Sequence, residues 1–207
     1  MNMYTLVKSK FNTILAVQDK LLEQRVLFFT PLDFQRIFHI SPLKAKYFLE
    51  TNTSRGLFIR LKKGLYSLRK NVPSEEEIAN ALYKPSYISF EYALCRYNIM
   101  PEMTYSVTSA TTKSTRNFEI GEKVFSYYTI QKKAFTGYMP EKIGKNVVLM
   151  AEPEKAFVDY MYFVSLGKRT YNERMSTLKL NKKKVIYFAK LYNRPSLIHL
   201  IKKYDKR

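Results

Sequence analysis

The chain has 207 residues, of which 46% are hydrophobic and 26% charged, as is ordinary for a globular protein. Its net charge of +19 is not ordinary and predicts a polyanionic partner, either nucleic acid or an anionic membrane surface. The single cysteine, Cys95, excludes a disulfide framework or a cysteine-based zinc cluster within one chain. The N-terminus has no apolar signal core, and no run approaches the ~20 apolar residues of a bilayer span. We therefore expect a cytoplasmic protein. A membrane-surface partner is not expected either, because the apolar residues of the basic C-terminal helices are needed for packing.

The positive charge is concentrated at the two ends of the sequence. Residues 1–70 hold 13 Lys/Arg and 4 Asp/Glu, residues 71–163 hold 10 and 11, and residues 164–207 hold 13 and 2. Two basic ends thus flank a neutral middle. A general enrichment in lysine does not produce this segregation, which indicates dedicated basic surfaces.

Two short helices with strong start signals are predicted in the first third. A helix capped by Asn12 is expected to run to about Gln24, followed by a short β-prone run at 26–30. Thr30-Pro31 and Ser41-Pro42 then each combine an N-cap residue with a proline at the first helical position. They predict a helix that ends near residues 39–40 and a helix over 42–52. A separation of only a few residues is typical of a helix-turn-helix.

The helix over 42–52 is the predicted recognition helix. Its exposed side is predicted to carry Lys44, Tyr47 and Thr51 at i, i+3 and i+7, with Lys46 nearby. A cation, an aromatic hydroxyl and a small hydroxyl suit phosphates and base edges. Ser41 is expected to offer its hydroxyl, or the amides of the helix N-terminus, to a phosphate. The alternative is an ordinary solvated helix face.

A basic hairpin follows at residues 55–69, with the sequence R-G-L-F-I-R-L-K-K-G-L-Y-S-L-R. Two β-prone runs, 57–61 and 65–68, flank Lys62-Lys63-Gly64, in which the glycine supplies the positive φ of a tight connection. Alternation predicts that one face of the hairpin packs on a core, through Leu57, Ile59 and Leu61. It predicts that the other face carries Phe58, Arg60 and Lys62.

A hairpin with a basic tip, placed after two short helices, has the layout of a winged helix-turn-helix. The predicted DNA-binding residues are Ser41, Lys44, Lys46, Tyr47, Thr51, Arg55, Arg60, Lys62 and Lys63. The alternative for the hairpin is a surface element with solubilising lysines.

We predict an α+β protein with two domains, a winged helix-turn-helix over 1–70 and a mixed α/β domain over 71–207. The second domain is expected to end in a basic helical segment from about residue 165. Ser74 and the three glutamates after it predict a helix start, and further helices are expected at 90–98, from Pro153, from Asn181 and from Pro195. Strands are expected at 87–89, 105–110, 117–120, 123–128, 135–138 and 147–150. The basic C-terminal helices are predicted to form either a second phosphate-binding surface or a solvated cap.

Glu152, Glu154, Lys155 and Asp159 permit two interpretations. Acids together with a lysine are typical of a metal nuclease, in which they bind a divalent ion and activate water. The same acids suit the positive end of a helix and need no metal there, and Asp159 is then expected to form a salt bridge or a cap. We favour the second interpretation and predict no catalytic residue, metal or cofactor.

Three stretches resemble the AbiEi family of type IV antitoxins and transcriptional regulators. They are the hairpin R-G-L-F-I-R-L-K-K-G-L-Y-S-L at 55–68, I-A-N-A-L-Y-K-P-S-Y-I-S-F-E-Y-A-L at 78–94 and A-E-P-E-K-A-F-V-D at 151–159. The resemblance implies a winged helix that binds inverted repeats of double-stranded DNA in its own promoter. It also implies a C-terminal domain that counteracts a nucleotidyltransferase toxin without a stable toxin complex. Two other classes stay open, namely a metal-dependent nuclease and an RNA- or toxin-binding module without sequence-specific DNA binding.

Overall fold

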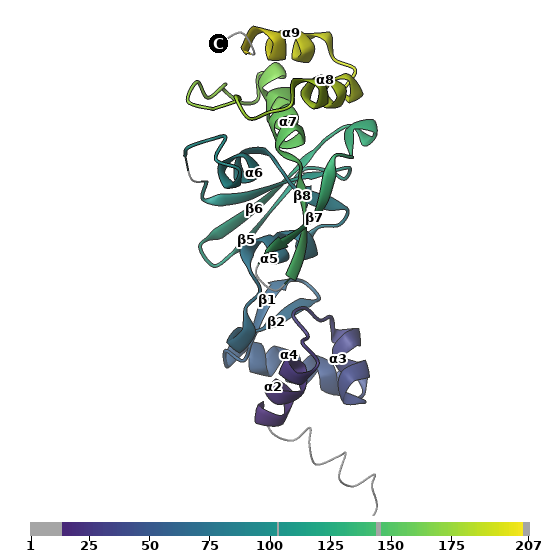
Figure 1. Ribbon diagram of the computed structural model, residues 1–207. Helices are drawn as coiled ribbons and strands as arrows, with labels where there is room; N and C mark the ends of the chain where they lie inside the picture. Colours follow the sequence, from purple (N-terminus) through teal and green to yellow (C-terminus); the bar gives the residue numbers. More distant parts are fainter. Residues whose placement is uncertain (1–13, 103, 144–145, 205–207) are drawn as a thin grey trace, which may run out of the picture. The chain divides into compact units, whose positions relative to one another are not determined.

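The computed structural model describes residues 14–102, 104–143 and 146–204 and combines helices with two β-sheets (Figure 1). The mixed composition agrees with the α+β class expected from the sequence. The predicted cap Asn12 lies outside the described residues. The chain divides into two compact units, Met1–Ser74 and Glu75–Arg207. Among the residues that the structure describes, no helix combines the length and the apolar character needed to cross a bilayer.

The first unit consists of helices and one antiparallel hairpin. Its elements are α2 (Ile14–Glu23), α3 (Pro31–Phe38), α4 (Pro42–Ser54), β1 (Phe58–Lys62) and β2 (Leu65–Leu68). Both predicted cap-plus-proline starts are confirmed. Thr30 and Asp33 form a reciprocal capping box at α3, and the Ser41 hydroxyl accepts from the backbone N–H of Lys44 at α4. Each cap satisfies an N–H group that has no partner within the helix.

An aromatic cluster forms the centre of the first unit. The ring of Phe34 in α3 lies 5.6 Å from that of Phe48 in α4 and 6.0 Å from that of Phe58 in β1. Phe29 reaches the hairpin by a backbone bridge to Tyr66 and packs on Phe58 at 5.4 Å. Since aromatic rings bury large apolar areas, these contacts fix the two helices and the hairpin relative to one another.

The hairpin is buried on both faces near its start. Leu57 and Leu61 are buried, as the alternation pattern predicted. Phe58 is fully buried in the core and pairs with Leu68, while Arg60 pairs with Tyr66. The prediction for Phe58 is therefore wrong, although Arg60 on the same strand is exposed. Burial of a phenyl ring is strongly favourable, so Phe58 joins the core although Arg60, on the same face, stays in solvent.

The second unit is built on a six-stranded mixed sheet with the strand order β5-β6-β4-β3-β8-β7. Its strands are β3 (Ser86–Ile88), β4 (Ser106–Thr111), β5 (Arg116–Ile120), β6 (Lys123–Thr129), β7 (Tyr138–Ile143) and β8 (Asn146–Ala151). Its helices are α5 (Glu75–Leu82), α6 (Phe90–Arg96), α7 (Pro153–Ser165), α8 (Lys182–Leu191) and α9 (Pro195–Tyr204). The β3–β8 and β4–β6 pairs are parallel, and the other pairs are antiparallel.

Helices cover both faces of this sheet. The hydroxyl of Tyr127 in β6 donates to the carbonyl of Ala79 in α5, whereas the ring of the adjacent Tyr128 packs on Phe163 in α7. Successive strand residues point to opposite faces. Therefore α5 and α7 lie on opposite sides of the sheet.

A side chain completes the hydrogen bonding of β8 where β3 is too short to do so. The amide group of Asn80 accepts from the backbone N–H of Leu149 and donates to its carbonyl. Leu149 also pairs with Pro140 in the edge strand β7. Both polar groups of Leu149 therefore point away from β7.

The strand predicted at 135–138 is wrong. Residues Lys132–Ala134 form a short 3-10 helix, and β7 begins only at Tyr138. Gly137 has a φ of +74°, and a Cβ atom at this position would lie 2.4 Å from Cε1 of Phe188. The close approach of α8 thus requires a glycine, and a positive φ breaks an extended run.

We predict that Gly137→Ala destabilises the second unit. The change combines a positive φ with a clash inside a packed core, which together cost about 2–4 kcal/mol of the free energy of unfolding. Urea denaturation measures this loss. The control is Gly121→Ala, because Gly121 also has a positive φ, +59°, but no atom within 4 Å of the added Cβ. Equal losses in the two variants would contradict the packing argument.

Candidate nucleic-acid interface

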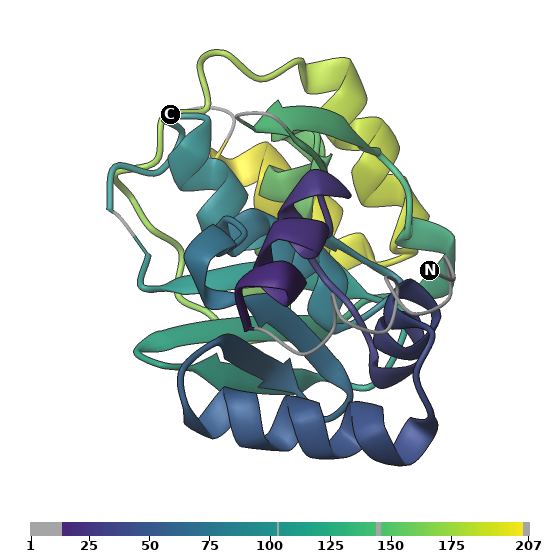
Figure 2. The ribbon, with the colours of Figure 1, turned by 90° about the horizontal axis from the view of Figure 1, so that it is seen from below.

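Helix α4 turns one side toward the core and leaves the other uncovered. Ala45, Leu49 and Asn52 are buried, and the exposed side chains at the centre of the opposite face follow at spacings of four, three and four residues: Leu43, Tyr47, Glu50 and Ser54. Figure 2 shows α4 along its length beside the hairpin. The uncovered face is thus a continuous row over the whole helix.

The predicted residues of α4 lie at different places relative to this row. Tyr47 belongs to it, while Lys44 and Lys46 are exposed on its two flanks. Thr51 is only half-exposed, at the edge of the face. Ser41 is exposed, and its hydroxyl oxygen already accepts the capping bond. Two lysines therefore flank a centre that is apolar at its N-terminal end.

Leu43 was missing from the sequence-based prediction, although it lies at the centre of the exposed face. It is 77% exposed, and Tyr47, one helical turn later, is 71% exposed. The spacing i, i+4 relative to Tyr47 was the available signal. A leucine in a helix with buried apolar neighbours is normally assigned to the core, and that assignment fails here.

The hairpin places its basic residues around a tight turn. Gly64 at the turn has a φ of +77°, and the pairing is irregular between Arg60 and Lys62. Arg60 and Lys63 are exposed, Lys62 is half-exposed, and Arg55 is exposed at the end of α4. The connection is therefore one residue shorter than predicted, because Lys62 still belongs to β1 and only Lys63 and Gly64 join the strands.

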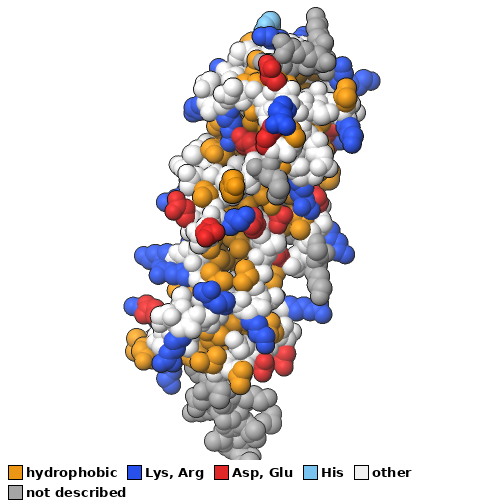
Figure 3. All heavy atoms as spheres, turned by 90° about the vertical axis from the view of Figure 1, so that its left-hand side faces the viewer, with side chains coloured by type: hydrophobic (Ala, Val, Ile, Leu, Met, Phe, Trp, Pro, Cys, Tyr) orange, Lys and Arg blue, Asp and Glu red, His pale blue; other side chains and the backbone are white. Residues whose placement is uncertain are grey.

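The cations of this surface are not neutralised within the part of the chain that the structure describes. No carboxylate there lies within ion-pair distance of the exposed basic residues Lys44, Lys46, Arg55, Arg60 or Lys63. On the face drawn in Figure 3, basic and hydrophobic side chains lie next to each other over the first unit. Unpaired cations on one surface produce a field that attracts a polyanion.

The acidic cluster of α7 forms a buried polar network in place of an open site. Lys155 and Asp159 have no exposed surface and form an ion pair. The Asp159 carboxylate also accepts from Ser89 at 2.7 Å, Tyr87 at 2.9 Å and Tyr192 at 2.5 Å. The salt bridge expected for Asp159 is thus confirmed, and its oxygens have no room for a metal ion.

Burial shifts the pKa of the lysine and of the two tyrosines of this network in opposite directions. Burial lowers the pKa of Lys155, although the neighbouring Asp159 opposes the shift. Burial, reinforced by the charge of Asp159, raises the pKa of Tyr87 and of Tyr192 well above the usual range. Both phenols therefore remain donors up to strongly alkaline pH.

The other two acids of the cluster have structural partners. Glu152 pairs with Lys184 at 2.5 Å, and Glu154 accepts from the backbone N–H of Asn181 at 3.0 Å. Within the described ranges, no group of three or more His, Cys, Asp and Glu residues could hold a metal ion. The geometry therefore does not favour the nuclease alternative.

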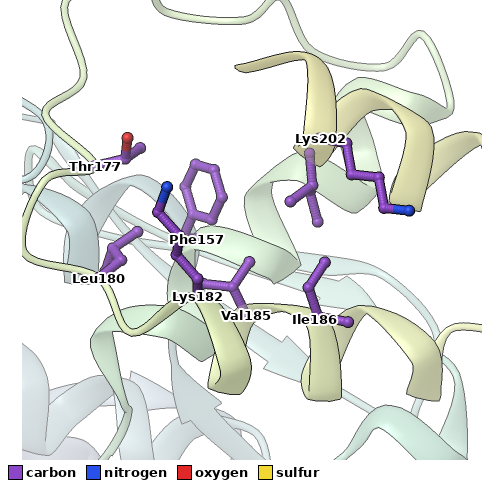
Figure 4. A pocket seen from close by; sticks show the side chains of 8 residues that line it. Phe157, Thr177, Leu180, Lys182, Val185, Ile186 and Lys202 are labelled. Carbon is purple, nitrogen blue, oxygen red and sulfur yellow. The ribbon is translucent and has the colours of Figure 1, made fainter. Parts of the chain in front are cut away.

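A hollow lies between α7, α8, α9 and the segment before α8 (Figure 4). Mostly apolar side chains line it, together with two lysines and a threonine: Phe157, Thr177, Leu180, Lys182, Val185, Ile186, Ile201 and Lys202. This lining contains no carboxylate, imidazole or thiol. It therefore lacks the usual metal ligands, and its ionisable groups are the two lysines.

The lysines that begin α8 lie at the helix end that disfavours cations. Asn181 caps this end by accepting from the backbone N–H groups of Lys183 and Lys184, and the Lys184 side chain pairs with Glu152. The cap and the ion pair thus explain how the start of α8 tolerates part of this positive charge. The choice between a phosphate-binding surface and a solvated cap stays open.

No protein-family model matches the chain, and no curated protein sequence matches it. The functional argument therefore depends on the surface of α4, on the hairpin and on the sequence patterns.

We predict strong coupling between Lys155 and Asp159 in a double-mutant cycle. Asp159→Leu leaves a buried ammonium without its counter-ion, so the free energy of unfolding should fall by about 3–5 kcal/mol. Lys155→Met/Asp159→Leu removes both charges and should lose clearly less than the sum of the single losses. Urea denaturation of the four proteins measures the coupling.

The pair Glu75–Lys123 serves as the control, because both of its side chains are more than one third exposed. An exposed pair should give a coupling of at most about 1 kcal/mol. Additive losses at Lys155 and Asp159 would show that the buried pair contributes nothing specific.

Proposed function

We propose that the chain is a DNA-binding transcriptional repressor whose first unit is a winged helix-turn-helix. In this proposal α3 and α4 are the helix-turn-helix, α4 is the recognition helix, and β1 with β2 is the wing. The observation that carries the proposal is the uncovered face of α4, flanked by two lysines without ion-pair partners among the described residues and followed by a basic hairpin. The aromatic cluster around Phe34 and Phe58 supports it by holding these elements in one fixed arrangement.

The dimensions of α4 suit the major groove. An α-helix with its side chains is about 10–12 Å wide, and the groove is about 12 Å wide. Recognition helices place their N-terminal residues nearest the base edges. Lys44 and Tyr47 would therefore reach bases or nearby phosphates, while Arg60, Lys62 and Lys63 of the wing would contact the backbone or the minor groove.

The resemblance to the AbiEi family extends the proposal to the biological role. We infer a repressor of its own promoter, bound at inverted repeats, that also serves as the antitoxin of a type IV toxin–antitoxin system. Its target would be a nucleotidyltransferase toxin, counteracted in the cytoplasm without a stable complex. The chain would act by binding and not by catalysis. The second unit would carry the antitoxin activity or position the DNA-binding unit.

We predict that the protein binds the DNA upstream of its own gene more tightly than scrambled DNA. Fluorescence anisotropy across a salt series measures both affinities. Lys44→Ala and the double variant Arg60→Ala/Lys63→Ala should weaken binding. Each lost phosphate contact should reduce the log–log salt slope by about 0.9.

Lys142→Ala and Lys133→Ala/Lys142→Ala are matched controls, since both lysines are exposed outside the proposed interface. These controls should keep the affinity and the slope. Equal binding to both DNAs with a steep salt slope would mean that the net charge of +19 attracts DNA without regard to its sequence. Unchanged affinity in the wing variant would favour an RNA- or toxin-binding module.

We also predict that neutralisation is separable from DNA binding. In cells that express a nucleotidyltransferase toxin encoded beside this gene, the intact protein should restore growth. The triple variant Lys44→Ala/Arg60→Ala/Lys63→Ala should still restore growth while no longer repressing a reporter under its own promoter. Loss of both activities together, with the variant folded, would contradict an antitoxin activity located in the second unit.

A further inference from the structure

The N-terminal half of α4 exposes two large apolar side chains that the fold does not use. Leu43 and Tyr47 lie one turn apart on the face opposite the buried Ala45 and Leu49. Such exposure contributes nothing to the stability of the unit, because neither side chain leaves water on folding. Together they form a small apolar spot at the centre of the proposed recognition face.

The surroundings of this spot indicate the chemistry of its partner. Lys44 lies on one flank and Lys46 on the other, and neither has an ion-pair partner among the described residues. An apolar groove on a protein would leave these two charges unmatched. The major groove offers the complementary pattern, in which the C5-methyl groups of thymine line the floor and phosphates line both walls.

The spacing also agrees with a row of bases. Four residues along an α-helix advance about 6 Å, and successive base pairs are about 3.4 Å apart. Leu43 and Tyr47 are therefore separated by about two base steps. A helix lying along the groove would bring each side chain to a different base pair.

We propose that Leu43 and Tyr47 read thymine methyl groups in the major groove and so determine part of the target sequence. This inference rests on the proposed DNA-binding function. Leu43 packs its isobutyl group on one methyl group, and the edge of the Tyr47 ring packs on another. The flanking lysines supply affinity, which does not depend on sequence.

The test uses two versions of the DNA upstream of the gene, one with thymidine and one in which deoxyuridine replaces every thymidine. The two DNAs have the same charge and base pairing and differ only in the methyl groups. Burial of one methyl group corresponds to about a four-fold change in affinity. The wild-type protein should bind the uracil DNA roughly fifteen-fold more weakly if it packs on two methyl groups.

Leu43→Ala and Tyr47→Ala should each bind the thymine DNA more weakly and lose part of the preference for it over the uracil DNA. Both side chains are exposed, so the melting temperatures should match that of the wild type. The matched control is Leu178→Ala, since Leu178 is 94% exposed in the second unit. This control should keep the full preference.

The possible failures can be told apart. If the wild-type protein does not prefer the upstream DNA over scrambled DNA, both the DNA-binding function and this inference are wrong. If it prefers the upstream DNA but binds the thymine and uracil versions equally, the function stands and the inference is overturned. The preference for thymine could also persist in both alanine variants. Other residues would then contact the methyl groups, or the methyl groups would act through the shape of the DNA, and either result overturns the inference.

Discussion

A fully buried ion pair is the constraint on which the second unit depends. Removing Lys155 and Asp159 from water costs several kcal/mol for each ion, and the fold compensates only because the carboxylate is completely hydrogen-bonded. The partners come from β3, the residue after β3, and the end of α8: Tyr87, Ser89 and Tyr192. The network is satisfied in one arrangement of sheet and helices, so it specifies how they pack.

The first unit is held together in a different way. Its core is an apolar cluster of aromatic and aliphatic side chains, whose contacts are non-directional but tightly packed. Because Phe34, Phe48 and Phe58 contact one another, helix α4 and the hairpin cannot move independently without opening that core. The proposed DNA-binding surface therefore rests on rigid elements, which is what readout of base positions requires.

Local signals explain which parts of this fold were predictable from the sequence. Caps and prolines mark helix starts whatever the tertiary context, so α3, α4 and α7 begin where expected. The exposure of Lys44, Lys46 and Tyr47 follows from helical periodicity. The segment before β7 was not predictable, because its shape depends on the contact of Gly137 with Phe188 on a distant helix.

Long-range contacts also limited how much of the polar network and of the α4 surface could be predicted from the sequence. Asp159 was expected to form a salt bridge or a cap, and the ion pair within α7 fits that expectation. Its bonds to Tyr87 and Tyr192 join residues far apart in the sequence, which periodicity does not reveal. Leu43 was missed because a leucine in an amphipathic helix is normally buried, and only the folded chain shows that nothing covers it.

The edge strand β7 has a consequence for self-association. Leu149 directs its N–H and carbonyl toward Asn80, so in this antiparallel pair the backbone nitrogen of Pro140 faces the open side of β7. Proline has no hydrogen there to offer to an incoming strand. The open edge thus lacks a donor where a second chain would begin to pair, as in other sheets that resist edge-to-edge aggregation. At Pro140 the open side of β7 is therefore a poor template for a further strand.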